Sequence, residues 1–162
     1  MSVEEYLHTS FEGADCEYLD GEVVERNMGN KSHGKIQLRI AAALQAHEGN
    51  TGIYVVVEVR QRVTDTRYRI PDVAVYEREP EEEVPSAPPL VAVEVLSPDD
   101  RFSDFLPKLQ EYLVWGVRHI WVADPPNRKL FHYDQTGLHE VANFSLPEMD
   151  IMLQNADIFG AI

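Results

Sequence analysis

Three pieces of sequence decide the fold: YRIPDVAVY (residues 68–76), PPLVAVEVLSP (residues 88–98) and DFLPKLQEYLVWGVRHIWVADP (residues 104–125). Their hydrophobic periodicity predicts two strands, then a helix, then a third strand, with an acidic loop between the first two strands. Asp72 and Glu94 interrupt runs that otherwise consist of Val, Ala, Leu and Ile. A charge inside an apolar strand is costly unless it is paired or binds a metal, so these two acids are the first candidates for function.

The bulk composition is typical of a soluble globular protein. A chain of 162 residues favours a single domain over residues 1–162. No apolar run approaches the roughly 18 residues that span a bilayer, and the first residues do not resemble a secretory signal. Cys16 is the only cysteine, which excludes an intramolecular disulfide and a cysteine-based zinc cage. We therefore expect a cytoplasmic protein.

The formal net charge is −14 at pH 7. This acidity argues against broad, non-specific adhesion to nucleic acid, because such adhesion depends on Lys and Arg neutralising phosphates. It does not exclude a local basic cleft, and it suits a site that gathers divalent cations. Solubility alone explains the charge more simply.

The residues before the deciding stretch predict two helices and a hairpin. The first helix covers residues 2–9, where Ser2 and Glu5 match a capping box. The hairpin covers residues 16–26 and turns at an Asp-Gly pair that favours a type I′ turn. The second helix begins at Ser32, where apolar residues take up helical spacing.

The rest of the chain completes an α/β (α+β) fold. Gly49 predicts the end of the second helix, and residues 53–63 predict one long strand that pairs with residues 68–76. Residues 77–89, rich in Pro and Glu, predict a solvated, mobile loop. A hairpin over residues 128–141 follows, and the tail has no clear pattern. Two β–α–β steps predict a mixed β-sheet flanked by helices, with an N-terminal β-hairpin.

The two strand acids suggest a metal site. If their strands are neighbours, Asp72 and Glu94 converge near one sheet edge. Together with the backbone carbonyl of Val95 they offer oxygen ligands suited to Mg²⁺ or Mn²⁺. Such an ion can activate a water and neutralise charge on a phosphoryl group during an in-line displacement.

Lys108 is the candidate cation beside these acids. It borders the apolar stripe of the helix predicted over residues 103–115, so its stem can lie on the core while its amine reaches the strand ends. There it could position the attacking water or stabilise pentavalent phosphorus. Taken alone, Lys108 is explained better by a surface ion pair with Asp104, four residues earlier, than by a role at the site.

These motifs together resemble the Uma-two family of restriction-endonuclease-like proteins, in the PD-(D/E)xK nuclease superfamily. The resemblance rests on PDVAV, VEVLSP, K-L-x-E-Y, WGV and IWVADP, preceded by EYLDGEVVE and a histidine, His33, that opens a helix. It covers nearly the whole chain, from about residue 3 to residue 125.

The resemblance implies a restriction-endonuclease-like core of order α-β-β-β-α-β and Mg²⁺-dependent hydrolysis of DNA phosphodiester bonds. It assigns Asp72 and Glu94 as metal ligands. The superfamily's usual lysine lies two residues after the second acid, where this chain has Leu96. The family resembled here uses a lysine of the following helix, which is Lys108.

Three supporting residues each have a plain alternative. Glu17 is either a third acid near the metal or an ordinary exposed strand acid, and the two are equally supported. His33 is either a contact for phosphate or water, or a solvated residue at a helix start, which is slightly favoured. Gln61 faces either the site or the solvent.

Arginines form one local basic cluster, which is the best candidate for a track along a phosphate backbone. A solvated hairpin is the usual alternative. The members are Arg60, Arg62, Arg67 and Arg69. A homodimer is the default assembly, and its two active sites would suit cutting both DNA strands.

Three functions stay open at this point. The first is an Mg²⁺- or Mn²⁺-dependent endonuclease that uses Asp72, Glu94 and Lys108, and it is the one we favour. The second is a catalytically inactive binding module with a nuclease fold. It is favoured by the absence of a lysine at position 96 and by the strongly negative net charge of the chain. The third is a metal-dependent hydrolase of a small phosphate compound, which explains the charge without a DNA groove.

Overall fold

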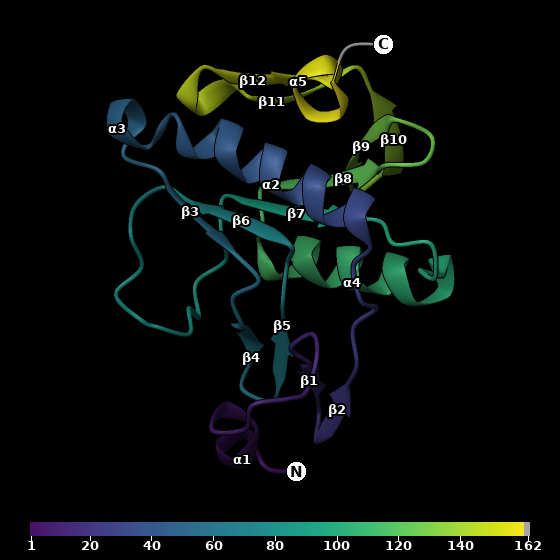
Figure 1. Ribbon diagram of the computed structural model, residues 1–162. Helices are drawn as coiled ribbons and strands as arrows, with labels where there is room; N and C mark the ends of the chain where they lie inside the picture. The colour runs from purple at the N-terminus through teal and green to yellow at the C-terminus, as the bar shows by residue number, and fades with distance from the viewer. Residues whose placement is uncertain (161–162) are drawn as a thin grey trace.

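The computed structural model describes residues 1–160, and its centre is a six-stranded mixed sheet between helices (Figure 1). The strand order is β10-β9-β8-β7-β6-β3. Only β7 and β8 are parallel within this sheet of the described residues; the other neighbours are antiparallel. The strands are β3 (Tyr54–Val57), β6 (Val73–Tyr76), β7 (Val91–Val95), β8 (His119–Asp124), β9 (Lys129–Asp134) and β10 (Gly137–Val141).

Different helices cover the two faces of this sheet, because side chains alternate along each strand. On β7, Val93 packs into the core with residues of α2 (Lys31–Gln45), whereas Ala92 packs with residues of α4 (Phe102–Trp115). The two helices lie on opposite sides of the sheet (Figure 1). In chain order these elements read α2-β3-β6-β7-α4-β8, which is the α-β-β-β-α-β order that the resemblance implied. No helix among residues 1–160 combines the length and apolarity needed to cross a membrane.

A smaller sheet holds the N-terminal end of the chain, with strand order β2-β1-β5-β4. Tyr6, Tyr18 and Tyr68 form its core. The predicted capping box and hairpin turn are both present, and both turn residues have positive φ angles. The elements are α1 (Val3–Leu7), β1 (Glu17–Leu19), β2 (Glu22–Val24), β4 (Gln61–Thr64) and β5 (Arg67–Arg69).

The prediction of one long strand over residues 53–63 is wrong, because the chain bends there from one sheet into the other. The break between β3 and β4 begins at Glu58, whose φ of 54° lies in the left-handed region. The facing strand breaks between β5 and β6, where Pro71 has no amide hydrogen to donate to a ladder. Asp72 lies at this bend, at the junction of the two sheets.

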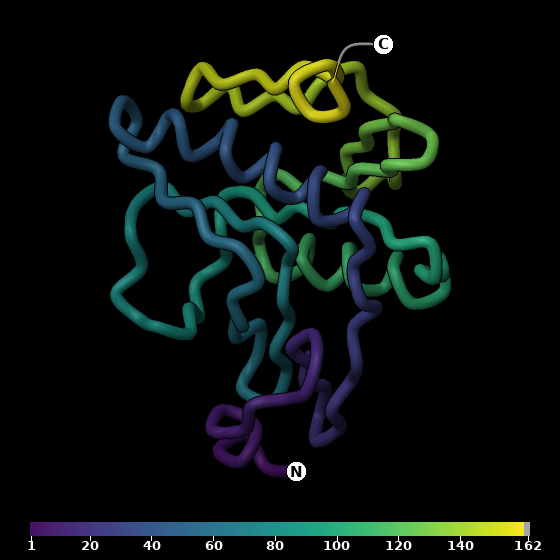
Figure 2. Tube along the Cα trace, in the orientation of Figure 1, coloured from purple at the N-terminus to yellow at the C-terminus, as the bar shows by residue number. Residues whose placement is uncertain are grey.

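The other corrections concern helix ends and the tail. Gly49 does not end the second helix: α2 ends at Gln45, and Gly49 lies inside α3 (Glu48–Thr51). The tail forms a hairpin and a short helix whose buried residues join the core on the α2 side of the sheet, at the end of the molecule opposite the N-terminus (Figure 2). Its elements are β11 (Asn143–Leu146), η1 (Pro147–Met149), β12 (Ile151–Gln154) and α5 (Asn155–Phe159).

The loop over residues 77–89 contains no helix or strand, as predicted, but it is not wholly solvated. The chain trace shows it leaving the large sheet and returning to β7 (Figure 2). The backbone amide of Arg62 donates a hydrogen bond of 2.8 Å to the carbonyl of Pro85, which is buried. The loop therefore supplies β4 with a backbone partner on its open side.

Candidate active site

A cleft of about 1030 Å³ opens where the two sheets meet α4. It brings together residues that are far apart in the sequence and come from β1, α2, the β5–β6 bend, β7 and α4. The predicted residues that line it are Glu17, His33, Arg67, Arg69, Asp72, Glu94 and Lys108. Their number and burial make this cleft the candidate active site.

Asp72 is buried at the bend and surrounded by donors. Its Oδ2 accepts a hydrogen bond of 2.7 Å from the backbone amide of Val95 and lies 3.3 Å from His33 Nε2. Its Oδ1 accepts a hydrogen bond of 3.0 Å from Arg26 Nη2. Burial alone would raise the pKa of Asp72, but the hydrogen bond and charge of His33, the charge of Lys108 and the Val95 amide together lower it.

Glu94 faces α4 because it alternates with the valines of β7 that face α2. Its Oε1 accepts a hydrogen bond of 2.7 Å from the Tyr112 hydroxyl and lies 2.9 Å from Lys108 Nζ. Its other oxygen, Oε2, accepts no hydrogen bond from the described residues. Burial raises the pKa of Glu94 to about 7; Lys108 and Tyr112 oppose the rise, and the charges of Asp72 and Glu17 add to it.

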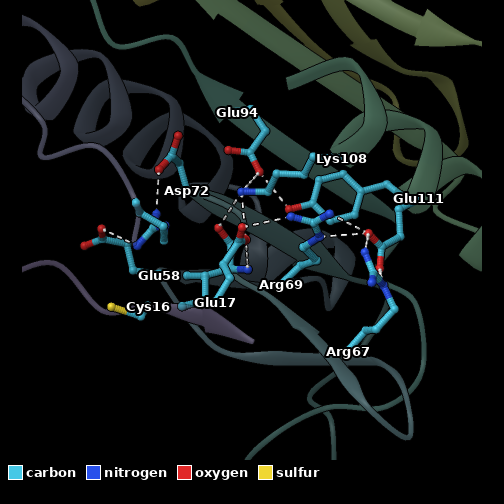
Figure 3. A network of polar contacts seen from close by, with 12 residues as sticks. Cys16, Glu17, Glu58, Arg67, Arg69, Asp72, Glu94, Lys108 and Glu111 are labelled. Atoms are coloured by element: carbon cyan, nitrogen blue, oxygen red, sulfur yellow. Dashed lines mark hydrogen bonds and ion pairs between the residues drawn. The ribbon is translucent and has the colours of Figure 1, made fainter. Parts of the chain in front are cut away.

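Lys108 lies between two acids rather than on the surface (Figure 3). Its Nζ is 2.9 Å from Glu17 Oε2 and 2.9 Å from Glu94 Oε1, and it donates a hydrogen bond of 3.3 Å to the carbonyl of Ile70. Within residues 1–160 it forms no ion pair with Asp104, which removes the alternative that the sequence favoured. Burial lowers the pKa of Lys108, but the charges of Glu17 and Glu94 raise it by more.

Glu17 is a buried anion and not an exposed strand acid. Besides Lys108, it contacts Arg69 Nη1 at 3.1 Å and accepts a hydrogen bond of 2.7 Å from the backbone amide of Ile70. Arg69 and Arg67 are in turn held by Glu111 of α4 (Figure 3). Glu17 therefore ties β1, the β5–β6 bend and α4 together beneath the cleft.

His33 is buried as well, and not a solvated residue at a helix start. Asn30 caps α2 by accepting the backbone amide hydrogen of His33, and this fixes the first turn. The imidazole then faces Asp72, and the hydrogen bond between them raises the pKa of His33 against the effect of burial.

Gln61 faces neither the cleft nor the solvent. It is 0% exposed, it does not line the cleft, and both atoms of its amide lack a hydrogen-bond partner among the described residues. A supporting role for Gln61 in the site stays a prediction, and its buried position away from the cleft does not favour that role.

The four predicted arginines do not form an unpaired basic track. Each guanidinium lies against a carboxylate, so its charge is already neutralised locally. The pairs are Arg60 with Asp15, Arg62 with Asp65, Arg67 with Asp20 and Glu111, and Arg69 with Glu17 and Glu111. The prediction that they bind a phosphate backbone has no support from this arrangement, because sequence proximity of like charges says nothing about their spatial partners.

Sequence reasoning missed Arg26 and Tyr112. The helical spacing of apolar residues over 103–115 places Tyr112 on the apolar stripe; a tyrosine hydroxyl that is buried usually has a hydrogen-bond partner, and that is a usable signal. Arg26 follows β2 and reaches Asp72 across 46 positions of sequence, for which the local pattern carries no signal.

The oxygen atoms of the cleft fit a divalent ion held by two carboxylates. Mg²⁺ commonly uses one or two carboxylates and completes its shell with waters or substrate oxygens. Glu94 Oε2 is unpartnered among the described residues, while Asp72 and the backbone of Val95 lie at the same cleft. Residues 1–160 contain no group of three or more His, Cys, Asp and Glu side chains placed to hold a metal, so these two carboxylates and the Val95 carbonyl are the donors to consider.

The pKa of Glu94 predicts how stability depends on pH. Without metal, the folded protein retains the Glu94 proton up to about pH 7, whereas the unfolded chain releases it near its ordinary pKa of 4.5. The wild type should therefore lose up to about 3 kcal/mol of stability relative to Glu94→Gln as pH rises from 4.5 to 7, and no more above that. Urea unfolding in chelator at several pH values measures this difference. A difference that stays constant across the window would contradict the prediction.

Comparison with known proteins gives one family and one fold. The model of the family Uma2, described as "Putative restriction endonuclease", matches residues 3–156. A solved structure described as "a putative nuclease belonging to DUF820 from Anabaena variabilis ATCC 29413" superposes with a TM-score of 0.85 at 20% identity, over 98% of this chain and 97% of that chain. At this identity the likeness shows the fold, a mixed sheet flanked by helices. No curated protein matches the chain.

Proposed function

The chain belongs to the Uma2 family of restriction-endonuclease-like proteins, and from this premise we propose that it is a metal-dependent endonuclease that hydrolyses DNA phosphodiester bonds. The family description and the nuclease neighbour support a nuclease in the broad sense. The observation that carries the finer proposal is the gathering of Asp72, Glu94 and Lys108 in one cleft from three separate elements.

Each residue has a role that its contacts suit. Asp72 and Glu94 would hold Mg²⁺ or Mn²⁺, which when bound supplies Lewis acidity and a more acidic water. Tyr112 holds one oxygen of Glu94, which leaves the other free toward the ion. Lys108 would offset negative charge that develops on the phosphate, and Glu17 holds its amine in place.

A small phosphate compound is the second candidate substrate, because the mouth of the cleft is acidic. Four exposed carboxylates line it, and they would repel a long polyanion such as DNA. They are Glu25, Asp99, Asp100 and Asp104. Arg101 is the exposed cation beside them.

Hydrolysis assays test the proposal and separate the two substrates. Wild-type protein should nick plasmid DNA and cut short single-stranded DNA with Mg²⁺ or Mn²⁺ and should be inactive in chelator. Lys108→Met should lower the cleavage rate at least about a hundredfold, because the charge that stabilises the transition state is gone. The matched control is Lys129→Met, which removes an exposed lysine paired with Glu140 outside the cleft and should leave the rate unchanged.

The possible outcomes of these assays are distinct. Metal-dependent hydrolysis of bis(4-nitrophenyl) phosphate without DNA cleavage would mean that the substrate is a small phosphate compound and not DNA. Absence of metal-dependent hydrolysis of any of these substrates would overturn the enzyme and leave a binding module. Full activity in Lys108→Met would remove this lysine from the chemistry.

A further inference from the structure

We infer that Arg26 occupies the cation position at Asp72 in the metal-free site and moves toward Glu58 when a divalent ion binds, so that Arg26 and Glu58 together set the metal affinity. This inference rests on the proposed metal site. It assigns a function to two residues that the proposed catalysis does not use.

The contacts of Arg26 place it between the two acids. Its Nη2 donates a hydrogen bond of 3.0 Å to Asp72 Oδ1, and its Nη1 lies 3.4 Å from Glu58 Oε1. Arg26 also lines the cleft, and its side chain is only 11% exposed. The two acids that it bridges are drawn side by side in the close view (Figure 3).

Asp72 has little room for a metal while Arg26 stays in place. Its Oδ2 is already taken by the Val95 amide and faces His33, so Oδ1 is the oxygen open to a new ligand. That oxygen holds the guanidinium of Arg26. An arginine cannot release its proton at any ordinary pH, so the positive charge must move away if a divalent cation is to approach.

Glu58 offers the guanidinium a second partner at the solvent edge. Its side chain is half exposed, whereas that of Asp72 is 5% exposed. Its backbone has a φ of 54°, unusual for a residue other than glycine, and its amide donates a hydrogen bond of 3.3 Å to the carbonyl of Asp72. The bend therefore fixes Glu58 beside Asp72, where it can keep the charge of Arg26 paired after Arg26 releases Asp72.

Calorimetric titration with Mn²⁺ tests this inference with a double-mutant cycle. Arg26→Gln should bind Mn²⁺ at least about tenfold more tightly than the wild type, because a repelling charge is gone. Glu58→Gln should bind it more weakly, because Arg26 then has only Asp72 as a partner. In the Arg26→Gln background the Glu58→Gln change should alter affinity by less than about twofold, because the two residues act as a pair.

Two controls keep the test specific. Arg62→Gln removes the same charge from an exposed ion pair with Asp65 outside the cleft and should leave Mn²⁺ affinity unchanged. Arg26→Lys keeps the charge but cannot bridge both acids, so its affinity should lie between those of the wild type and Arg26→Gln. It also serves if Arg26→Gln does not fold, which circular dichroism would show.

The inference and the proposed function fail in different ways. Binding by the wild type with equal or weaker binding by Arg26→Gln overturns the role of Arg26 and leaves the metal site standing. An undiminished effect of Glu58→Gln in the absence of Arg26 also overturns it, since Glu58 would then act by its own charge. Absence of Mn²⁺ binding in both the wild type and Arg26→Gln overturns the metal site and this inference together.

Discussion

Replacement of Glu17 by Gln is expected to lower the free energy of unfolding by about 3–5 kcal/mol. Glu17 is 4% exposed and is the shared anion of Lys108 and Arg69. A glutamine keeps an oxygen for the Ile70 amide but leaves two buried cations with less negative charge beside them. Each cation keeps one other carboxylate, Glu94 for Lys108 and Glu111 for Arg69, but part of its desolvation cost is no longer compensated.

The matched control lies on the same hairpin. Glu22→Gln changes an exposed residue of β2 in the same chemical way, and it should alter stability by less than about 0.5 kcal/mol. Urea unfolding and thermal melts compare the two variants, with a shift in Tm of about 2–4 °C expected per kcal/mol for a chain of this size. If Glu17→Gln is as stable as Glu22→Gln, the buried ion network does not hold the two sheets and α4 together.

The strands and the main helix could be predicted from the sequence because their patterns are local. The apolar runs of β7 and β8 and the helix that ends at Gly116 are present as expected, whereas only the second half of the strand predicted over residues 68–76 belongs to the large sheet, as β6. The bend between the sheets was not predictable in the same way. Residues 53–63 have continuous β-type character, and only the tertiary arrangement shows that β3 and β4 belong to different sheets.

The residues of the site also differ in whether a local sequence pattern predicts them. Asp72 and Glu94 stand out because a charged residue interrupts an apolar strand, and this signal is readable from the local sequence alone. Lys108 needed the family resemblance, since by itself it fitted a pair with Asp104. The burial of Glu17 and the reach of Arg26 depend on how a three-residue strand and a loop pack against distant residues, and no periodicity encodes that.

The arginine cluster shows that a local sequence pattern can also predict a feature that the structure does not contain. Four arginines close in sequence indicated a cationic surface, but each has a carboxylate partner, and most of these come from distant segments. Ion pairing depends on contacts between segments, so counting charges along the chain overestimates the positive surface. If the chain binds DNA, the contact must involve other groups or the release of some of these pairs.

The central claim is that Asp72 and Glu94 hold one divalent ion, and their joint removal should have the largest effect on the site. Asp72→Ala with Glu94→Ala deletes both carboxylates, while the Val95 carbonyl alone is too weak a ligand for Mg²⁺ or Mn²⁺. We expect Mn²⁺ affinity to fall at least about a hundredfold in the double variant, because two charged ligands are lost.

The control for this variant removes two carboxylates elsewhere. Glu79→Ala with Glu81→Ala, in the acidic loop over residues 77–89, changes the net charge by the same amount outside the cleft. Its Mn²⁺ affinity should equal that of the wild type. This comparison separates ligand loss from the general attraction of an acidic protein for cations.

Calorimetric titration of Mn²⁺ into the wild type and these two double variants is the most direct test. The predicted result is stoichiometric binding by the wild type and by the loop variant, and loss of that binding when Asp72 and Glu94 are replaced. Absence of binding by both the wild type and Arg26→Gln up to millimolar Mn²⁺, or unchanged binding without Asp72 and Glu94, would contradict the account and leave the two acids as buried structural groups.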